Sequence, residues 1–313
     1  MAQPFKFFYY DNGTPKNLLG LDDAEVVSMI ERDMTSWRMA QIQAGEAPEA
    51  TRGNFDLDHL KAIHGHVFQD VYEWAGMTRA HELTVEGQQV EPPNGIAKHD
   101  GRVPLEFIRS DAVEQHLEET FIQLREQNFL QGLPREAFAD RAAVTFARIN
   151  DAHPFMEGNG RTQREFMEQL ADRAGHELRF DVVSGERMSI VSYEARAGDV
   201  SSMQRLFQEI TDPQRVQLLQ EGQRHLEGIE YDWHQKYVAT VTPGREYQGQ
   251  VAVTSPDVVV VWSEGDILLA QTRDFERQPD TREIVSFTAS AYDRTAELED
   301  GRAGRGRQID FDL

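Results

Sequence analysis

The hydrophobic period of this chain changes once, near residue 230. Before that point apolar residues recur three and four positions apart, which is typical of amphipathic helices. After it, short runs rich in β-branched residues are separated by Gly and Pro, which is typical of strands. The predicted helices cover residues 21–43, 57–74, 104–127, 135–150, 162–174, 184–195, 200–211 and 213–228, and the predicted strands cover residues 237–241, 247–253, 258–262, 267–270 and 284–287. We therefore predict a mainly α protein in which a helical body is followed by a small β-barrel.

One segment inside the helical part has a different pattern. Over residues 77–97, short alternation around Gly87 is followed by Pro92 and Pro93, which predicts a β-hairpin flap on the helical body. The expected organisation is then a helical domain over residues 1–230, a barrel over 231–290 and a mobile tail over 291–313.

Composition excludes several classes of function. The chain has no cysteine, so disulfides, thiolate metal sites and cysteine nucleophiles are absent. Its 54 acidic and 32 basic residues give a net charge of −22, which repels phosphate backbones, and we expect no nucleic-acid partner. No apolar run reaches the ~18 residues that a membrane span needs, and the first residues do not have the pattern of a secretory signal. We expect a protein that works in solution, without a membrane partner.

Residues 153–164, His-Pro-Phe-Met-Glu-Gly-Asn-Gly-Arg-Thr-Gln-Arg, contain the chemically informative part of the sequence. Gly158 and Gly160 allow backbone N–H groups to turn toward an anion, and the helix that follows presents its positive end there. Arg161 and Arg164 lie one helical turn apart, so both guanidinium groups can reach one polyphosphate. This pattern indicates a phosphate-binding loop.

Three further residues of the same segment suggest a reaction. Asn159 offers an amide donor for a phosphate oxygen. Glu157 would be repelled by phosphate unless a divalent cation lay between them, and Mg²⁺ is the usual ion in such a place. His153 is close enough to take a proton from an incoming hydroxyl group at neutral pH. For any one of these residues an ordinary turn or a solvated side chain is the simpler explanation, but that explanation fails for the whole ordered set.

The same segment resembles the complete signature of the Fic family, His-x-Phe-x-(Asp/Glu)-Gly-Asn-Gly-Arg-x-x-Arg, without a mismatch. Other family positions are resembled by Leu60-x-x-Ile-His64, by Phe68 and Tyr72-Glu-Trp-Ala-Gly76, and by the earlier Asn17-Leu-x-Gly20. The strand-rich C-terminal part is similar to the OB-type barrel that follows the Fic core in Bep/VbhT-like proteins.

This resemblance implies a protein adenylyltransferase, which moves AMP from ATP onto a Ser, Thr or Tyr hydroxyl group of a target protein and releases pyrophosphate. Relatives that phosphorylate carry a lysine at the position of Gly160, so this sequence favours AMP transfer. The implied roles are His153 as base, Glu157 as Mg²⁺ ligand, Asn159 at the α-phosphate, Gly158, Gly160 and Arg161 at the β-phosphate, and Arg164 at the γ-phosphate. The flap would pair with the target as an added strand, with Thr84, Val85, Glu86 and Gly87 as its expected contacts.

Regulation and place of action stay open at this point. Fic enzymes are commonly inhibited by a helix with the pattern (Ser/Thr)-x-x-x-Glu-(Gly/Asn), and this sequence does not contain that pattern. We therefore expect either a small separate antitoxin that inhibits in trans, or no inhibition. The protein is expected in the bacterial cytoplasm or in a recipient or host cell after delivery by a secretion system. The alternatives are a non-catalytic interaction protein that uses flap and barrel, and a Fic enzyme with another donor or with de-AMPylation activity.

Overall fold

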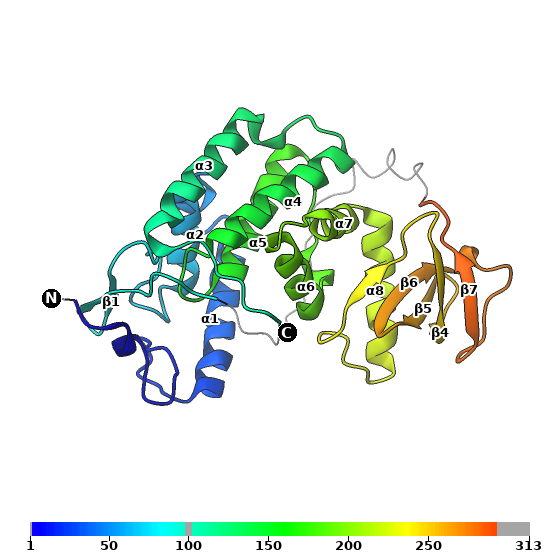
Figure 1. The fold of residues 1–313 in the computed structure, drawn as a ribbon, viewed down its shortest axis with the longest axis horizontal. Helices are drawn as coiled ribbons and strands as arrows, with labels where there is room; N and C mark the ends of the chain where they lie inside the picture. Colours follow the sequence, from blue (N-terminus) through cyan, green and yellow to red (C-terminus); the bar gives the residue numbers. More distant parts are fainter. Residues whose placement is uncertain (1, 98–101, 293–313) are drawn as a thin grey trace. The chain divides into compact units, whose positions relative to one another are not determined.

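The computed structural model describes residues 2–97 and 102–292. The chain divides into two compact units, Met1–Asp212 and Pro213–Leu313 (Figure 1). The helices are α1 (Ala24–Ala44), α2 (Leu57–Phe68), α3 (Val113–Glu126), α4 (Arg135–Ala152), α5 (Asn159–Ala174), α6 (Gly185–Arg196), α7 (Ser201–Ile210) and α8 (Pro213–Gly228). Each predicted helix is therefore present. The tail expected over residues 291–313 lies, from residue 293 on, outside the described residues.

Helix α4 occupies the centre of the first unit, where it contacts α3, α5, α6 and α7. Its buried face contains Phe138, Ala142, Phe146 and Ile149, which recur at the spacing of one helical turn. Helix α2 contacts α1, α3 and α5. The C-terminal end of α4 and the N-terminal end of α5 are thus held by helices on several sides, and the short loop between them contains the signature segment.

Helix α3 is shorter than predicted. It begins at Val113 and not near Pro104. The backbone N–H of Phe107 is instead paired with a distant carbonyl group, and the Ile108 carbonyl accepts a hydrogen bond from the Arg79 guanidinium. Because these long-range bonds use the backbone groups that a helix would need, the segment is irregular.

Helix α2 also ends early, at Phe68, although the apolar spacing continues to Trp74. Turns occupy most of the residues from 69 to 76, and the Val71 carbonyl accepts a hydrogen bond of 2.8 Å from the N–H of Leu18. Trp74 is nevertheless buried. The apolar pattern here reflects packing in the core and not helix.

The predicted flap is a β-hairpin. Strand β1 (Leu83–Val85) pairs antiparallel with β2 (Gln88–Val90). The two connecting residues, Glu86 and Gly87, both have positive φ angles, of 50° and 70°. Such a two-residue turn matches the twist of the strands that it joins.

The second unit consists of α8 and a five-stranded sheet in the order β3-β6-β5-β4-β7. The strands are β3 (Val238–Thr240), β4 (Glu246–Thr254), β5 (Val258–Ser263), β6 (Asp266–Gln271) and β7 (Ile284–Thr288). Strand β3 is parallel to β6, and the other neighbours are antiparallel. Every predicted strand is present. Within the described part of the chain the edge strands β3 and β7 do not pair with each other, so closure into a barrel stays a prediction.

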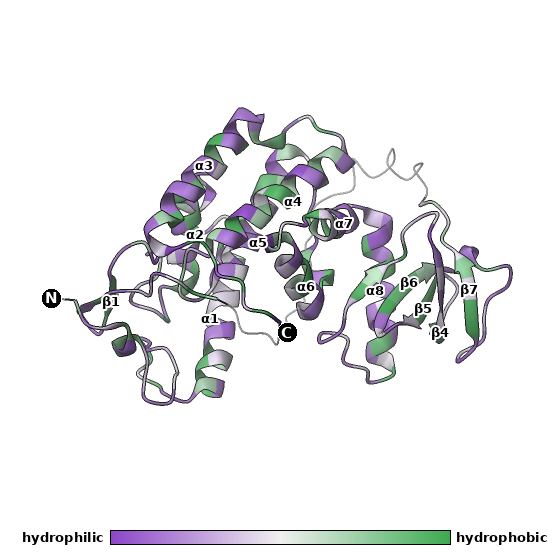
Figure 2. Cartoon of the chain, viewed as in Figure 1, coloured by the Kyte–Doolittle hydropathy of each residue, from purple (hydrophilic) through white to green (hydrophobic). Residues whose placement is uncertain are grey.

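Helix α8 packs against β3, β5 and β6. Gly222 approaches the sheet so closely that a Cβ atom there would lie 2.5 Å from the Leu269 side chain. The strands β5 and β6 are largely hydrophobic (Figure 2).

The boundary expected near residue 230 lies at the end of α8, whereas the two compact units divide before this helix begins. None of the helices in residues 2–97 and 102–292 is both long and apolar enough to cross a membrane.

Candidate active site

The signature segment folds as the end of one helix, a loop and the start of the next helix. Helix α4 ends where His153 adopts a left-handed conformation with φ of 41°, and Pro154 follows it. Gly158, with φ of 79°, precedes the first residue of α5. Because the first turn of α5 contains no acidic residue, its free N–H groups form a suitable site for an anion.

Gly158 is required by its surroundings. A Cβ atom at this position would lie 2.2 Å from the Phe68 ring, and the positive φ angle is itself unfavourable for other residues. Gly160 differs, because it is helical and exposed, and a Cβ atom there would lie 3.4 Å from Nη1 of Arg164.

Asn159 fixes the loop from within. Its Oδ1 accepts a hydrogen bond of 2.9 Å from the N–H of Phe155, and its Nδ2 donates one of 2.7 Å to the Phe155 carbonyl. The side chain is buried. An amide nitrogen has two hydrogens, so one donor is left after these contacts for a phosphate oxygen.

The His153 ring is oriented by an aromatic contact. It stacks on Phe107 with ring centroids 4.0 Å apart and an angle of 18° between the planes. The Arg196 guanidinium lies over the same Phe107 ring, 4.0 Å from its centroid. Because a ring has only two faces, Phe107 is held between the imidazole and the cation.

Arg79 holds the end of α4. This arginine is fully buried, and it donates to the carbonyl groups of His153 at 2.8 Å, Ala152 at 2.9 Å and Ile108, and to Oγ of Ser110 at 2.8 Å. Burial lowers the pKa of Arg79 to about 10. A single cation thus satisfies carbonyl groups that the end of a helix leaves without partners.

His64 holds the other end of the loop. Its Nδ1 accepts a hydrogen bond of 2.8 Å from the N–H of Gly76, so the proton is on Nε2, which donates to the Glu157 carbonyl at 3.1 Å. The ring stacks on Phe155 with centroids 3.8 Å apart. Burial lowers the pKa of His64 to about 3, and this histidine is therefore neutral.

The two signature arginines have different surroundings. Arg161 donates to the Glu31 carboxylate and to Oγ1 of Thr35, both on α1. Arg164 makes no hydrogen bond or ion pair within residues 2–97 and 102–292. Burial lowers the pKa of Arg164; the nearby Glu168 carboxylate opposes this shift and the charge of Arg161 adds to it. An unpaired and partly dehydrated guanidinium is suited to bind an anion.

Glu157 is the acidic residue of the loop. The protein atoms around its carboxyl group and the Glu31 carboxylate raise the pKa of Glu157 to about 7, while the residue stays in contact with solvent. No group of three potential ligands occurs among the described residues. One carboxylate together with substrate phosphates is nevertheless a common way to hold Mg²⁺, so the donor set fits this ion.

The four flap residues are not equivalent. Val85 is buried, so its side chain is part of the core, whereas Thr84 is partly exposed. Glu86 pairs with Lys16 at 2.7 Å, and the N–H of Gly87 donates to the Glu73 carboxylate at 3.1 Å. The tip of the hairpin is therefore attached to the body of the first unit.

His64 belongs to the Leu60-x-x-Ile-His64 stretch that resembles family positions, and the sequence predicted it as a packing or surface histidine. Sequence patterns did not identify the other residues that hold the signature segment, namely Glu31, Arg79 and Phe107. Each is a single polar or aromatic residue inside an otherwise helical or irregular stretch. Arg79 offers the only signal that could have been used, because it closely follows the Trp74-Ala-Gly76 match and precedes the hairpin.

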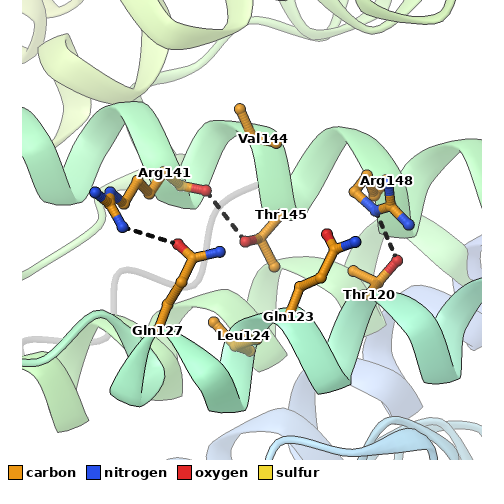
Figure 3. A pocket seen from close by; sticks show the side chains of 8 residues that line it. All are labelled: Thr120, Gln123, Leu124, Gln127, Arg141, Val144, Thr145 and Arg148. Atoms are coloured by element: carbon orange, nitrogen blue, oxygen red, sulfur yellow. Dashed lines mark hydrogen bonds between the residues drawn. The ribbon is translucent and has the colours of Figure 1, made fainter.

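A polar groove between α3 and α4 lies apart from the signature segment (Figure 3). Arg148 donates to Thr120 at 2.9 Å across it, and Arg141 donates to Gln127 at 3.3 Å. These polar groups bind one another, and we assign the groove no function.

Residues 54–171 match the model of the Fic/DOC family. A protein adenylyltransferase of Bartonella henselae is 33% identical over 251 residues, which cover 80% of this chain and 45% of that protein. A probable protein adenylyltransferase Fic of Salmonella typhimurium is 31% identical over 202 residues, which cover 64% of this chain and 90% of that protein. The solved structure of the type IV secretion system effector protein BepA is 28% identical, with a TM-score of 0.83 over 94% of this chain and 99% of that one. This chain spans less than half the length of the Bartonella henselae relative.

Proposed function

The chain belongs to the Fic/DOC family, and on that premise we propose that it transfers AMP from ATP to a Ser, Thr or Tyr hydroxyl group of a target protein. The observation that best supports this proposal is the folded signature segment. His153 ends α4, and Arg161 and Arg164 project from the start of α5, where the helix offers its free N–H groups. This arrangement supports the proposal that one loop provides both a base and a polyphosphate site.

The proposed nucleotide contacts follow from this arrangement. The backbone N–H groups of Gly158 and Gly160, together with Arg161, would bind the β-phosphate, and the unpaired Arg164 would bind the γ-phosphate. The remaining amide hydrogen of Asn159 would bind the α-phosphate. Pyrophosphate would then be held by two guanidinium groups, which stabilises the charge that it gains as it leaves.

His153 would act as the general base. It would take the proton of the target hydroxyl group while the hydroxyl oxygen attacks the α-phosphorus. The bond between the α-phosphorus and the oxygen that bridges to the β-phosphate then breaks, and pyrophosphate leaves. Because the stack on Phe107 fixes the plane of the imidazole, His153 is oriented before the target arrives.

Glu157 would hold Mg²⁺ beside the phosphates of the bound nucleotide. When bound, this ion would neutralise phosphate charge and polarise the bond that breaks. The surrounding protein and the Glu31 carboxylate raise the pKa of Glu157, and a bound cation would favour the ionised form of this carboxyl group.

The target segment would add to the flap along β1. The outer side of β2 is already used by Gln3, whose N–H donates to the Gln89 carbonyl at 2.7 Å and whose carbonyl accepts from Glu91 at 3.2 Å. An added strand would therefore pair beside Thr84 and bring its hydroxyl residue toward the loop.

A carboxylate from a separate antitoxin could pair with Arg164 and inhibit transfer. The reaction is proposed for a cytoplasm, the bacterial one or that of a recipient cell, where ATP is available.

The experiment that tests this function incubates the protein with ATP labelled at the α-phosphate, Mg²⁺ and a bacterial lysate. We expect a labelled protein band that is absent with His153→Ala and absent with ATP labelled at the γ-phosphate. Label from the γ-phosphate would indicate phosphorylation instead. A lack of label in bacterial and host lysates, with nucleotide binding intact, would favour the non-catalytic interaction protein.

A further inference from the structure

Arg161 is held by a helix that is distant from it in sequence. Its Nη2 donates to the Glu31 carboxylate and its Nη1 donates to Oγ1 of Thr35 at 2.9 Å, and both partners lie on α1, one helical turn apart. The guanidinium also lies over the Phe68 ring, 4.7 Å from its centroid. Three contacts from two helices therefore determine the orientation of this side chain.

Glu31 is itself held in place. One carboxylate oxygen accepts from Arg161, and the other accepts from the hydroxyl group of Tyr72. Only 13% of the Glu31 side chain and 30% of the Arg161 side chain are exposed. An ion pair with this little exposure, in which both carboxylate oxygens have partners, is better ordered than a pair on the surface.

The contacts with α1 do not use all the donors of Arg161. A guanidinium group has five N–H donors, and those to Glu31 and Thr35 use two of them. Three donors are left for a phosphate group. The side chain is therefore ordered in advance, which reduces the entropy lost when a nucleotide binds.

We propose that Glu31 is a positioning residue, which orients Arg161 toward the β-phosphate of the nucleotide. This inference rests on the proposed function, because it takes the β-phosphate as the ligand of Arg161. It extends the nucleotide site to α1, which precedes the segment matched by the family model.

A merely structural role for Glu31 makes a different prediction, and α1 provides the matched control. Arg38, on the same helix, pairs with Asp70 through two bonds of 2.6 and 2.8 Å. If Glu31 only attached α1 to the body of the first unit, Asp70→Asn would have the same effect on nucleotide binding as Glu31→Gln. If Glu31 positions Arg161, only Glu31→Gln affects it.

The test measures the binding of ADP and of AMP by calorimetry in the presence of Mg²⁺. We expect Glu31→Gln to weaken ADP binding by about tenfold, as for the loss of one well-oriented charged contact, and to leave AMP binding unchanged, because AMP has no β-phosphate. Asp70→Asn should leave both affinities unchanged. In the Arg161→Ala background, Glu31→Gln should have no further effect on ADP binding.

Three outcomes would overturn the proposal: unchanged or tighter ADP binding by Glu31→Gln, an equal loss of AMP binding, or a further loss in the Arg161→Ala background. If Glu31→Gln does not fold, Thr35→Val provides the second variant and should weaken ADP binding about threefold without changing AMP binding. Binding of ADP does not depend on AMP transfer. A wild-type protein that binds ADP but labels no target would therefore contradict the proposed function and still test the role of Glu31.

Discussion

At the scale of single residues, Gly158 illustrates how two physical constraints can meet at one position. The backbone needs a positive φ angle there, and the Phe68 ring occupies the place that a Cβ atom would take. Gly175 shares only the first constraint, because its φ angle is 83° and a Cβ atom there would have no atom within 4 Å beyond its chain neighbours. A comparison of the two glycines therefore separates the cost of backbone strain from the cost of close packing.

We expect Gly158→Ala to lower the free energy of unfolding by about 2–4 kcal/mol, as strain and overpacking add. Gly175→Ala should lower it by only about 1 kcal/mol. Urea unfolding of both variants measures this difference, and ADP binding should be lost in the first variant alone. Equal losses of stability would show that Phe68 can move aside.

His64 makes the stability of the protein depend on pH. Its pKa is about 3 in the folded protein and near 6.5 in the unfolded chain. Between these values the unfolded chain binds a proton that the folded protein does not, so stability falls as pH falls through this window, by up to about 1.4 kcal/mol per pH unit. His64→Phe should be less stable at pH 7, because it loses two hydrogen bonds, but should depend less on pH between 6.5 and 4. The free energy of unfolding is measured by urea unfolding at several pH values. If it depends on pH equally in the wild-type protein and in His64→Phe, this assignment is contradicted.

At the scale of elements, Arg79 joins three segments that are separate in sequence: the end of α4, the irregular stretch before α3 and the start of the flap region. Arg79→Met should lower the free energy of unfolding by about 3–5 kcal/mol, because buried carbonyl groups lose their donor. Arg109→Met is the control, since Arg109 is exposed and pairs with Asp111 at 3.4 Å, and it should change stability by less than about 0.5 kcal/mol. Urea unfolding checks both values, and similar small losses would mean that water replaces Arg79.

The irregular stretch before α3 also supplies Phe107, the ring on which His153 stacks. We expect Phe107→Leu to lower the rate of AMP transfer by about tenfold while ADP binding stays unchanged, because the variant loosens the base and not the phosphate site. Phe107→Tyr keeps the ring and should keep most of the activity. A loss of ADP binding in Phe107→Leu would instead point to collapse of the loop.

At the scale of the whole molecule, each unit has a hydrophobic core of its own. In the second unit it is formed by Val251, Val259, Val261 and Phe287 with their neighbours, and α8 packs on the same sheet. A fragment of residues 1–212 should therefore fold and bind ADP. A fragment of residues 1–230 should aggregate more readily, because α8 keeps its apolar face without the sheet. Circular dichroism and light scattering test this division. If the fragment 1–212 aggregates and the fragment 1–230 stays folded and monomeric, α8 belongs with the helical unit.

Much of the fold could be predicted because the signals are local. Hydrophobic period located the helices α1 to α8 and the strands β3 to β7, and Gly87 between alternating residues located the hairpin. The predictions were wrong at residues 69–74 and 104–112, where backbone groups bond to distant partners. Helical spacing of apolar residues indicates which side chains are buried. A side chain can be buried without being part of a helix, as Trp74 is.

The signature segment could be identified from sequence because its members lie within residues 153–164, so one loop and one helix turn bring them together. The sequence by itself thus determined the order of the main elements and the family resemblance, and it contains in one segment the residues that we propose to meet the nucleotide. Only the tertiary structure decided what holds them: Glu31 at Arg161, Arg79 at the end of α4, and Phe107 beneath His153. The physical reason is that a single polar or aromatic residue in a helical pattern does not indicate its partner. That partner is set by the packing of helices that are far apart in the chain.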